Sequence, residues 1–285
     1  DPKKFSPPKT PWGEPDLQGT YSNRTITPFE RPANVDGREF FTKEEVAGLE
    51  SRAQQSGGDE GRTKGSRQDV ERAYNDFWWD RGTKVVVTRR TSLIVDPPDG
   101  RIPAPAPGAA ERARAQAAAR QGRGPADRAQ DLSLGTRCVH SGTPNIRAGY
   151  QSYFDITQGP GVVALRTEMI HDARIFPIGG GPHISSAIRQ YHGESRAFWD
   201  GDTLVVDTIN FSNAGFRGST DKLHLTEKFR RVPEDTLEYS LTIDDPTVWS
   251  RPWTLMIPLK KTGEKMFEFA CLEGNYGLRA ILSGA

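Results

Sequence analysis

The chain has 285 residues with 38 basic and 37 acidic side chains, which leaves a formal net charge of +1. The chain contains 29 Gly and 21 Pro, and both residues are more frequent than in average proteins, where they make up roughly 7% and 5% of the residues. Only 35% of the residues are hydrophobic. The even charge argues against a general nucleic-acid-binding protein. No run of about 18 apolar residues is present, which excludes a transmembrane helix, and Gly lacks the three-residue period of collagen.

The first 40 residues are rich in proline and polar side chains. Proline has no amide hydrogen and clashes with the preceding helical turn, so this segment cannot form a continuous helix. We expect residues 1–40 to be an extended arm over the surface of the main body, with a short strand at residues 17–21. Such an arm could also dock on a second copy of the chain by adding a strand to its sheet, which would give a homo-oligomer.

Two helices are expected before residue 140. Thr42-Lys43-Glu44-Glu45 is a capping box, in which the Thr42 hydroxyl and the Glu45 carboxylate satisfy each other's amides, and it predicts a helix over residues 43–54. Residues 101–137 contain seven Arg and three acidic residues, and their alanine content predicts a second helix over 109–121. A basic helix of this kind could touch an anionic partner, but it is more often a solvated surface insertion.

The remaining pattern is mostly that of β-strands. Residues 69–79 should form a short helix or turn with three adjacent aromatic residues, and residues 84–95 should form a strand. From residue 149 onward strands follow one another with short connections and no helices, which predicts an antiparallel sheet. The expected strands cover 161–176, 196–199, 203–207, 223–232, 236–243, 253–259, 266–271 and 277–282, with Asp200-Gly201 as a hairpin turn.

These elements predict an all-β, mainly antiparallel fold with a few short helices. Consecutive hairpins suit a meander and closure removes exposed edges, so a calycin-like β-barrel is favoured, with a β-sandwich as the alternative. Gly19-Thr20-Tyr21 and Arg279 resemble the first-strand motif and the stacking residue of calycin barrels. The chain would then consist of the arm at 1–40 and one barrel domain at 41–285 with an insertion at 101–137.

Cys138 and Cys271 are the only cysteines. In an oxidising compartment they could form one disulfide, which would contribute roughly 4–5 kcal/mol through the long loop that it closes. Two separate buried thiols are an equal alternative, because a free cysteine behaves as a small apolar residue.

The strongest chemical candidates lie between Glu168 and Arg174. Strand alternation places Glu168, Asp172 and Arg174 on one face and His171 on the opposite, mostly apolar face, which we expect to point into the core or lumen. There His171 could be a general base, since its ordinary pKa is near 6.5, and a hydrogen-bonded structural histidine is the alternative. Arg174 would bind an anion or form an ion pair with Asp172 or Glu168.

Other polar and aromatic residues complete the expected site. Asp172 or Glu273 would orient the base or donate a proton, and the substrate-binding candidates are His183, Asn210, Trp249, Trp253 and Tyr276. The two tryptophans could stack on a ring or seal the barrel end. His171, His183 and His192 could meet as a metal site, but their spacing is not diagnostic. P-loop, Gly-x-Ser-x-Gly, His-Glu-x-x-His and Cys-x-x-Cys motifs are absent, so no cofactor and no metal is expected.

Five segments of the chain carry a resemblance to a known family, and they begin at Pro11, Thr27, Glu168, Asp244 and Glu273. Together they resemble a family of secreted proteins of environmental bacteria such as acidobacteria and sphingomonads. The resemblance covers nearly the whole chain and implies export through a cleaved leader, and therefore a periplasmic or extracellular location. It also implies a link to cofactor-free lyases and decarboxylases that act on phenylcoumaran-type lignin dimers. Family members often have His where this chain has Leu272.

The sequence therefore favours an exported, cofactor-independent lyase that acts by acid–base chemistry on a small aromatic or plant-derived molecule. Its expected partner is a small-molecule ligand, with no nucleic acid. One alternative is a non-catalytic extracellular binding or self-assembling protein, which the long arm favours. The other is a metal-dependent hydrolase.

Overall fold

The computed structural model describes residues 5–56, 79–80, 82–146, 149–150, 152–212, 216–233 and 235–284. Nine strands form one barrel in the order β7-β6-β5-β1-β12-β11-β10-β9-β8, and every hydrogen-bonded neighbour along this order is antiparallel. The strands are β1 Gly19–Ser22, β5 Tyr153–Gly159, β6 Val162–Thr167, β7 Ala173–Pro177, β8 Glu194–Asp200, β9 Thr203–Ile209, β10 His224–Val232, β11 Thr236–Asp244 and β12 Trp253–Thr262.

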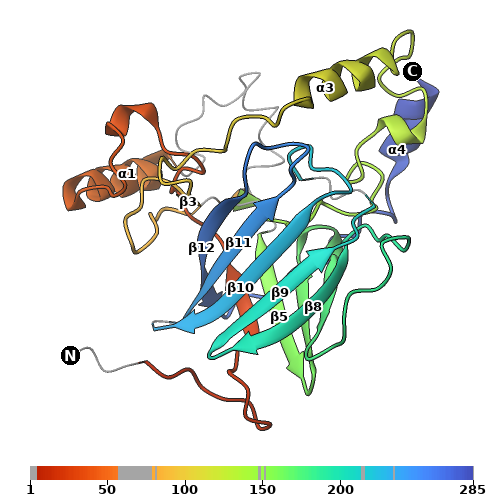
Figure 1. Ribbon diagram of the computed structural model, residues 1–285. Coiled ribbons are helices and arrows are strands. Elements are labelled where there is room, and N and C mark those ends of the chain that lie inside the picture. Colours follow the sequence, from red (N-terminus) through yellow and green to blue (C-terminus); the bar gives the residue numbers. More distant parts are fainter. Residues whose placement is uncertain are drawn as a thin grey trace.

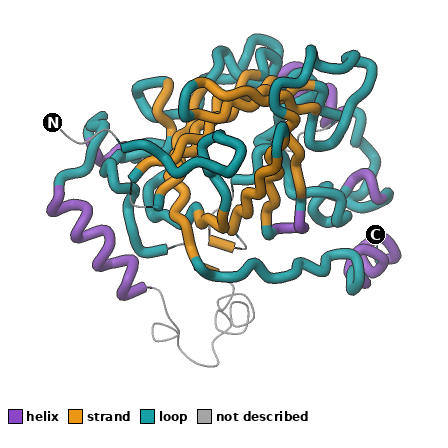
Figure 2. Tube along the Cα trace, turned by 90° about the horizontal axis from the view of Figure 1, so that it is seen from below, coloured by secondary structure: helices purple, strands orange, loops and turns teal. Residues whose placement is uncertain are grey.

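The barrel is nearly closed by its two edge strands. With nine strands that alternate in direction, β7 and β8 must run parallel, and a single parallel bridge joins Ile178 to Ala197. The Gly179 amide also donates to the Ala197 carbonyl at 3.0 Å. Figure 2 shows the strands arranged around a common interior. The prediction of an antiparallel β-barrel rather than a sandwich is confirmed.

Smaller elements surround this barrel. β3 (Ile94–Asp96) pairs with β12, and β2 (Trp79–Asp80) pairs with β4 (Gly149–Tyr150) in a separate two-stranded sheet. The helices are α1 Lys43–Ser56, α3 Ala109–Ala118 and α4 Tyr276–Ser283, with 3₁₀ turns at Ala33–Val35, Ala129–Asp131 and Met169–His171. In the part of the chain that the structure describes, no helix is both long and apolar enough to cross a bilayer.

The two ends of the barrel differ. Tight turns close the lower end in Figure 1, with Gly161 and Gly201 at positive φ between paired strands. Long segments cover the upper end, where α3 and α4 also lie. Because these segments reach the barrel from distant parts of the sequence, the upper end is where a site can be assembled.

The predicted capping box is confirmed. The Glu45 amide donates to the Thr42 hydroxyl at 3.1 Å and the Thr42 amide donates to the Glu45 carboxylate at 2.8 Å. The hydrogen bond from Arg38 and that from the Thr42 amide lower the pKa of Glu45 to about 2. α1 extends two residues beyond the predicted end at residue 54. The alanine-rich helix is also present as α3, although it ends at Ala118 rather than at residue 121.

The N-terminal segment differs from the expected surface arm. β1 lies between β5 and β12 inside the sheet, and Leu17 and Tyr21 are fully buried. The Tyr21 hydroxyl donates to the Leu17 carbonyl at 2.9 Å, and burial raises the pKa of Tyr21 to about 12. The short strand expected at 17–21 is present at 19–22, as an integral barrel strand.

Both strands expected after residue 262 are wrong. Residues 263–275 contain no helix or strand, and the predicted strand at 277–282 is α4, so Arg279 lies on a helix outside the barrel. The physical reason is that β12 already pairs with β11 on one edge and with β1 and β3 on the other, which leaves no free edge.

In residues 84–95 only Ile94 to Val95 belong to a strand. Val85 and Val86 are buried instead in an irregular segment. The helix or turn predicted at 69–79 lies, apart from Trp79, outside the described residues.

The disulfide alternative is confirmed, since Cys138 and Cys271 are bonded at an S–S distance of 2.02 Å. It ties the C-terminal tail to the segment that covers the upper end of the barrel.

Candidate functional site

A buried ion pair crosses the interior of the barrel. The Arg174 guanidinium on β7 donates to both oxygens of Glu227 on β10, at 2.9 and 2.6 Å. The Tyr239 hydroxyl donates to Glu227 Oε1 at 2.5 Å, and Arg174 Nη2 donates to the Thr208 hydroxyl at 3.2 Å. Glu227 is fully buried and Arg174 is 8% exposed. Burial raises the pKa of Tyr239 well above its ordinary value, which keeps the phenol protonated.

This ion pair contradicts two expectations: the direction in which Arg174 points and the residue with which it pairs. The single strand expected at 161–176 is two antiparallel strands, β6 and β7, joined by the 3₁₀ turn Met169–His171, so strand alternation does not apply to residues 168–172. Asp172 and Arg174 are nevertheless buried, and His171 is exposed. The expected orientation was therefore wrong, because Glu227 neutralises Arg174 inside the barrel. The ion-pair partner of Arg174 is likewise neither Asp172 nor Glu168.

Ser141, Gly142 and Thr143 each form a hydrogen bond to the side chain of another polar residue. The Ser141 amide and hydroxyl donate to Asp172 Oδ2, at 3.0 and 2.9 Å. The Gly142 amide donates to His140 Nδ1 at 2.9 Å, and the Thr143 hydroxyl is 2.9 Å from His192 Nδ1. The segment 141–143 thus fixes Asp172 just before β7, His192 just before β8, and its own neighbour His140.

Asp172 and His192 form a second polar pair. His192 Nε2 lies 3.4 Å from Asp172 Oδ1. Burial raises the pKa of the Asp172 carboxyl, but the hydrogen bonds from His192 and Ser141 outweigh it, so the pKa lies below its ordinary value. An ionised Asp172 favours a proton on His192 Nε2, which leaves Nδ1 to accept the Thr143 hydroxyl proton. This arrangement can move a proton between a hydroxyl and an imidazole.

His140, Asp172 and His192 are also the residues best placed to hold a metal ion. One potential ligand atom of each lies within 4.8 Å of the other two. The Gly142 amide, however, donates to His140 Nδ1, so in the neutral ring the proton sits on Nε2. A metal would have to displace that proton, because only an unprotonated nitrogen binds a metal. As placed, the cluster suits proton transfer better than metal binding.

A cavity of about 420 Å³ lies next to this cluster. This volume falls within the roughly 300–1,000 Å³ of typical ligand sites. The walls combine aromatic and aliphatic side chains with a few neutral polar groups and one cation. The described residues that line it are Thr25, Thr27, Phe29, Leu93, Ser141, Gly142, Pro144, Asn145, Ile146, Phe216 and Arg217.

A small void lies between the cavity and the buried ion pair. It measures about 10 Å³, enough for about one water molecule. Asp172, Arg174 and His192 line it, and it shares Gly142 and Asn145 with the larger cavity. The Asn145 amide nitrogen donates to the Ser141 and Thr167 hydroxyls at 2.8 and 3.3 Å. Asn145 therefore separates the ligand-sized cavity from the proton-transfer pair.

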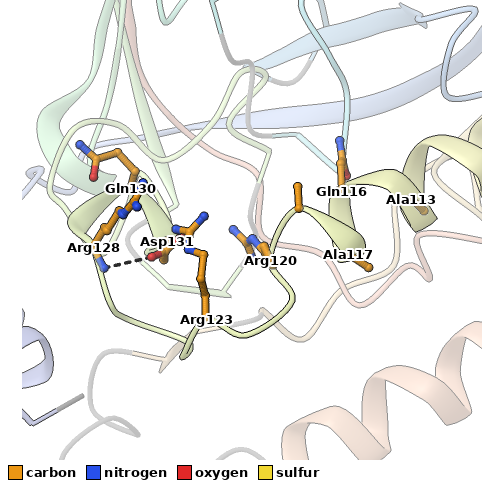
Figure 3. Close-up of a pocket in the computed structure, with 9 residues that line it drawn as sticks. Ala113, Gln116, Ala117, Arg120, Arg123, Arg128, Gln130 and Asp131 are labelled. Atoms are coloured by element: carbon orange, nitrogen blue, oxygen red, sulfur yellow. Dashed lines mark hydrogen bonds and ion pairs between the residues drawn. The ribbon is translucent and has the colours of Figure 1, made fainter.

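A larger depression on the surface is a weaker candidate. It measures about 820 Å³ and lies beside α3, where Arg120, Arg123 and Arg128 surround Asp131 (Figure 3). Asp131 already pairs with Arg123, and no residue of α3 is buried. The only apolar residues that line it are alanines, so it lacks the aromatic and branched side chains that form the walls of the smaller cavity.

His183 and Asn210 fasten the segment that connects β7 to β8. His183 bonds to Glu194 through Nδ1 and to Asp207 through Nε2, the latter at 2.7 Å. Asn210 donates to the Ile184 carbonyl at 3.1 Å. His224 also forms a hydrogen bond to Asp207, and this bond raises the pKa of His224. These contacts hold a crossover segment against the outer wall, away from the cavity lining.

The other predicted site residues divide between the barrel end and the exposed tail. Trp253 is fully buried and packs edge-on against Trp249, with ring centroids 5.4 Å apart, so the pair seals the barrel. His171 is exposed, with Nδ1 3.1 Å from the Phe269 carbonyl. Glu273 and Tyr276 are exposed on the C-terminal tail. Of the predicted catalytic residues, the structure brings together only Asp172 and Arg174.

Several residues of the site escaped the sequence prediction. Glu227 had a usable signal, since it lies between Leu225 and Phe229 on the apolar face of a strand, where a lone carboxylate needs a buried partner. Thr143 and Arg217 lie in irregular segments without periodicity, and no local pattern marks them. His192, which the sequence suggests only as a metal ligand, pairs with Asp172 instead.

We expect Asp172→Asn to lower the free energy of unfolding by about 1–3 kcal/mol at about pH 6, since it removes a charged acceptor. The pKa of Asp172 in the folded protein lies below its ordinary value. Its stabilising contribution is therefore fully present above the unfolded pKa and is lost as the pH falls through the folded pKa. Urea unfolding should show the full difference at about pH 6 and a smaller difference as the pH is lowered. Asp202→Asn, at an exposed turn, serves as the control.

The chain matches no family model and no curated protein. Solved structures with some similarity include a secretary abundant heat soluble (SAHS) protein from Ramazzottius varieornatus, at 12% identity and a TM-score of 0.26 over 39% of this chain and 70% of that chain. Two mutants of the fluorescent protein UnaG are 14% identical, with TM-scores of 0.24 and 0.26. They cover 39% and 46% of this chain, and 72% and 86% of their own.

Proposed function

We propose that the protein binds a small, partly apolar organic molecule in the cavity at the covered end of its barrel. The observation that carries this proposal is the cavity of about 420 Å³ with aromatic and aliphatic walls and a few polar groups, at the barrel mouth. Its walls come from four segments far apart in the sequence, near residues 25–29, 93, 141–146 and 216–217.

The core beneath the cavity supports a preformed site. Phe29 and Phe216 line the cavity, and both contact the fully buried Trp253, with centroid distances of 6.1 and 6.2 Å. Trp253 begins β12 and pairs with Ile243 of β11. Two walls of the cavity are therefore anchored to barrel strands, so little side-chain ordering is needed when a ligand binds.

A filling substitution tests the proposal. Ile146→Trp should reduce ligand affinity at least tenfold, because the larger side chain occupies the cavity that Ile146 lines. Isothermal calorimetry with a library of aromatic and aliphatic compounds measures it. Ile188→Trp, at an exposed position, is the matched control. If no compound binds the wild-type protein, or if the filled variant binds equally well, the proposal is wrong.

A second candidate function is proton-transfer catalysis, in line with the lyase expected from the family resemblance. The arrangement of Thr143, His192 and Asp172 favours it, because the two ring nitrogens of His192 face a hydroxyl and a carboxylate. In this proposal His192 takes the role of base that the sequence suggested for His171. His192→Gln should abolish turnover while ligand affinity stays within twofold, and His171→Gln should leave both unchanged.

We also propose that the protein works in the periplasm or outside the cell. The disulfide supports this, since such bonds persist in oxidising compartments and are rare in reducing ones. Self-assembly through residues 1–40 stays a further proposal. Within that segment β1 pairs inside the chain's own barrel, so a contact between copies would have to use other residues. Light scattering of the full chain would measure the oligomeric state.

A further inference from the structure

We propose that the cavity takes an aromatic carboxylate, with the ring against Phe29 and Phe216 and the carboxylate on Arg217. This inference rests on the proposed binding function and specifies its ligand class. It follows from the charge of the cavity, the state of the Arg217 guanidinium and the aromatic walls.

The charge of the cavity favours a single negative group. Arg217 is the only charged residue among the described residues that line it, and no Asp or Glu is among them. Within the described part of the chain, Arg217 has neither an ion pair nor a hydrogen bond. Other arginines near this end differ, since Arg174 pairs with Glu227 and Arg189 with Asp221. An unpaired cation at the edge of an apolar cavity attracts an anion.

The position of Arg217 leaves its donors available. Its guanidinium carbon lies over the Phe29 ring, 4.1 Å from the ring centroid, in a cation–π contact. A cation–π contact uses none of the guanidinium N–H groups as a conventional hydrogen-bond donor to an oxygen or nitrogen. A carboxylate accepts two such N–H groups side by side, whereas a neutral amide offers a single acceptor oxygen.

The walls favour an aromatic body for the same ligand. Phe29 stands edge-on to Trp253 with an interplanar angle of 76°, and Phe216 lies nearly parallel to Trp253 at 25°. The two phenyl rings thus present differently oriented faces to the cavity that both line. Aromatic pairs in edge or offset geometries are stabilised beyond the burial of their area, whereas an aliphatic chain gains only the burial. Trp253 also contacts both walls, so its emission should report binding.

The experiment compares acids with their neutral amides. Calorimetry and tryptophan emission measure binding of 3-phenylpropionate and 2-naphthoate, of the corresponding primary amides, and of hexanoate. We expect each aromatic acid to bind about tenfold or more tightly than its amide and than hexanoate. Arg217→Gln should remove the preference for the acid and leave amide affinity unchanged. Arg217→Lys, which keeps the charge but loses the fork, should show an intermediate preference.

The controls separate this inference from the binding function itself. Arg230→Gln changes an exposed arginine of β10 that does not line the cavity and should alter nothing. Retained amide binding by Arg217→Gln shows that this variant is folded. Equal affinity for acid and amide, or no effect of Arg217→Gln, overturns the aromatic carboxylate while binding stands. If neither acids nor amides bind the wild-type protein, both this inference and the binding function fail.

Discussion

Replacing Glu227 with Gln is expected to lower the free energy of unfolding by about 3–5 kcal/mol, because the substitution leaves Arg174 charged and uncompensated inside the barrel. Glu227 is fully buried and accepts hydrogen bonds from Arg174 and Tyr239. Urea unfolding at neutral pH, followed by circular dichroism, measures the change. Arg174→Met should cost a similar amount, since it leaves the carboxylate without its cation.

The neighbouring exposed pair supplies the matched control. Arg230 and Glu238 lie on the same two strands, β10 and β11, and pair at 2.9 Å with side chains 50% and 30% exposed. Glu238→Gln should therefore cost less than about 1 kcal/mol. A triple variant with Arg174→Met, Glu227→Leu and Tyr239→Phe should be more stable than Glu227→Gln alone, because no buried polar group is left without its partner. If Glu227→Gln and Glu238→Gln destabilise equally, the buried pair is not formed.

Removal of the disulfide is expected to have the second large effect. Cys138 and Cys271 are separated by 133 residues, and the loop between them contains most of the barrel strands. The double variant Cys138→Ser, Cys271→Ser should lose about 3–5 kcal/mol of unfolding free energy, since the unfolded chain regains the entropy that the cross-link removed. Urea unfolding of the variant, and of the wild-type protein with a thiol reductant, measures it.

Local effects of the same change should be visible by hydrogen exchange. The disulfide fastens the tail of residues 263–275 beside the segment that holds Asp172 and His192. Asn275 adds hydrogen bonds to the Thr136 carbonyl and to the Cys138 sulfur, at 3.1 and 3.2 Å. Without the bond we expect faster exchange in α4 and little change in β10 and β11. Uniform exchange rates in variant and wild type, together with an unchanged unfolding free energy, would contradict the prediction.

Sequence patterns correctly predicted those elements that are stabilised by contacts between residues close together in the sequence. The capping box around Thr42 and the meander from residue 194 to residue 262 are local: an N-cap satisfies amides three residues away, and a hairpin pairs strands across a short turn. The tail after residue 262 failed for the opposite reason. Its alternating apolar residues suit a strand, but strand formation also requires a free partner edge, and β1 and β3 occupy that edge.

In the candidate site, too, local patterns were informative, whereas contacts with distant residues could not be predicted. Alternation assigned Glu168, Asp172 and Arg174 to one face of a continuous strand, but a 3₁₀ turn at Met169–His171 interrupts that strand, and alternation could not tell which side chains are buried. That choice depended on Glu227, which lies 53 residues after Arg174 and turns a charged face into an interior one. The apolar neighbours of His171 predicted that its side chain points into the barrel. The side chain is exposed instead, because the sequence does not show which charged residues find a buried partner.

The sequence by itself determined that the chain folds as an antiparallel β-barrel with a helix-bearing insertion, because period-two alternation and turn residues act over short distances. Only the tertiary structure decided where β1 inserts, which of the polar faces points inward, and that Thr143, Asp172 and His192 meet beside a ligand-sized cavity. These outcomes depend on contacts between residues 20 or more positions apart. Such contacts form only when the barrel closes, and no local pattern encodes them.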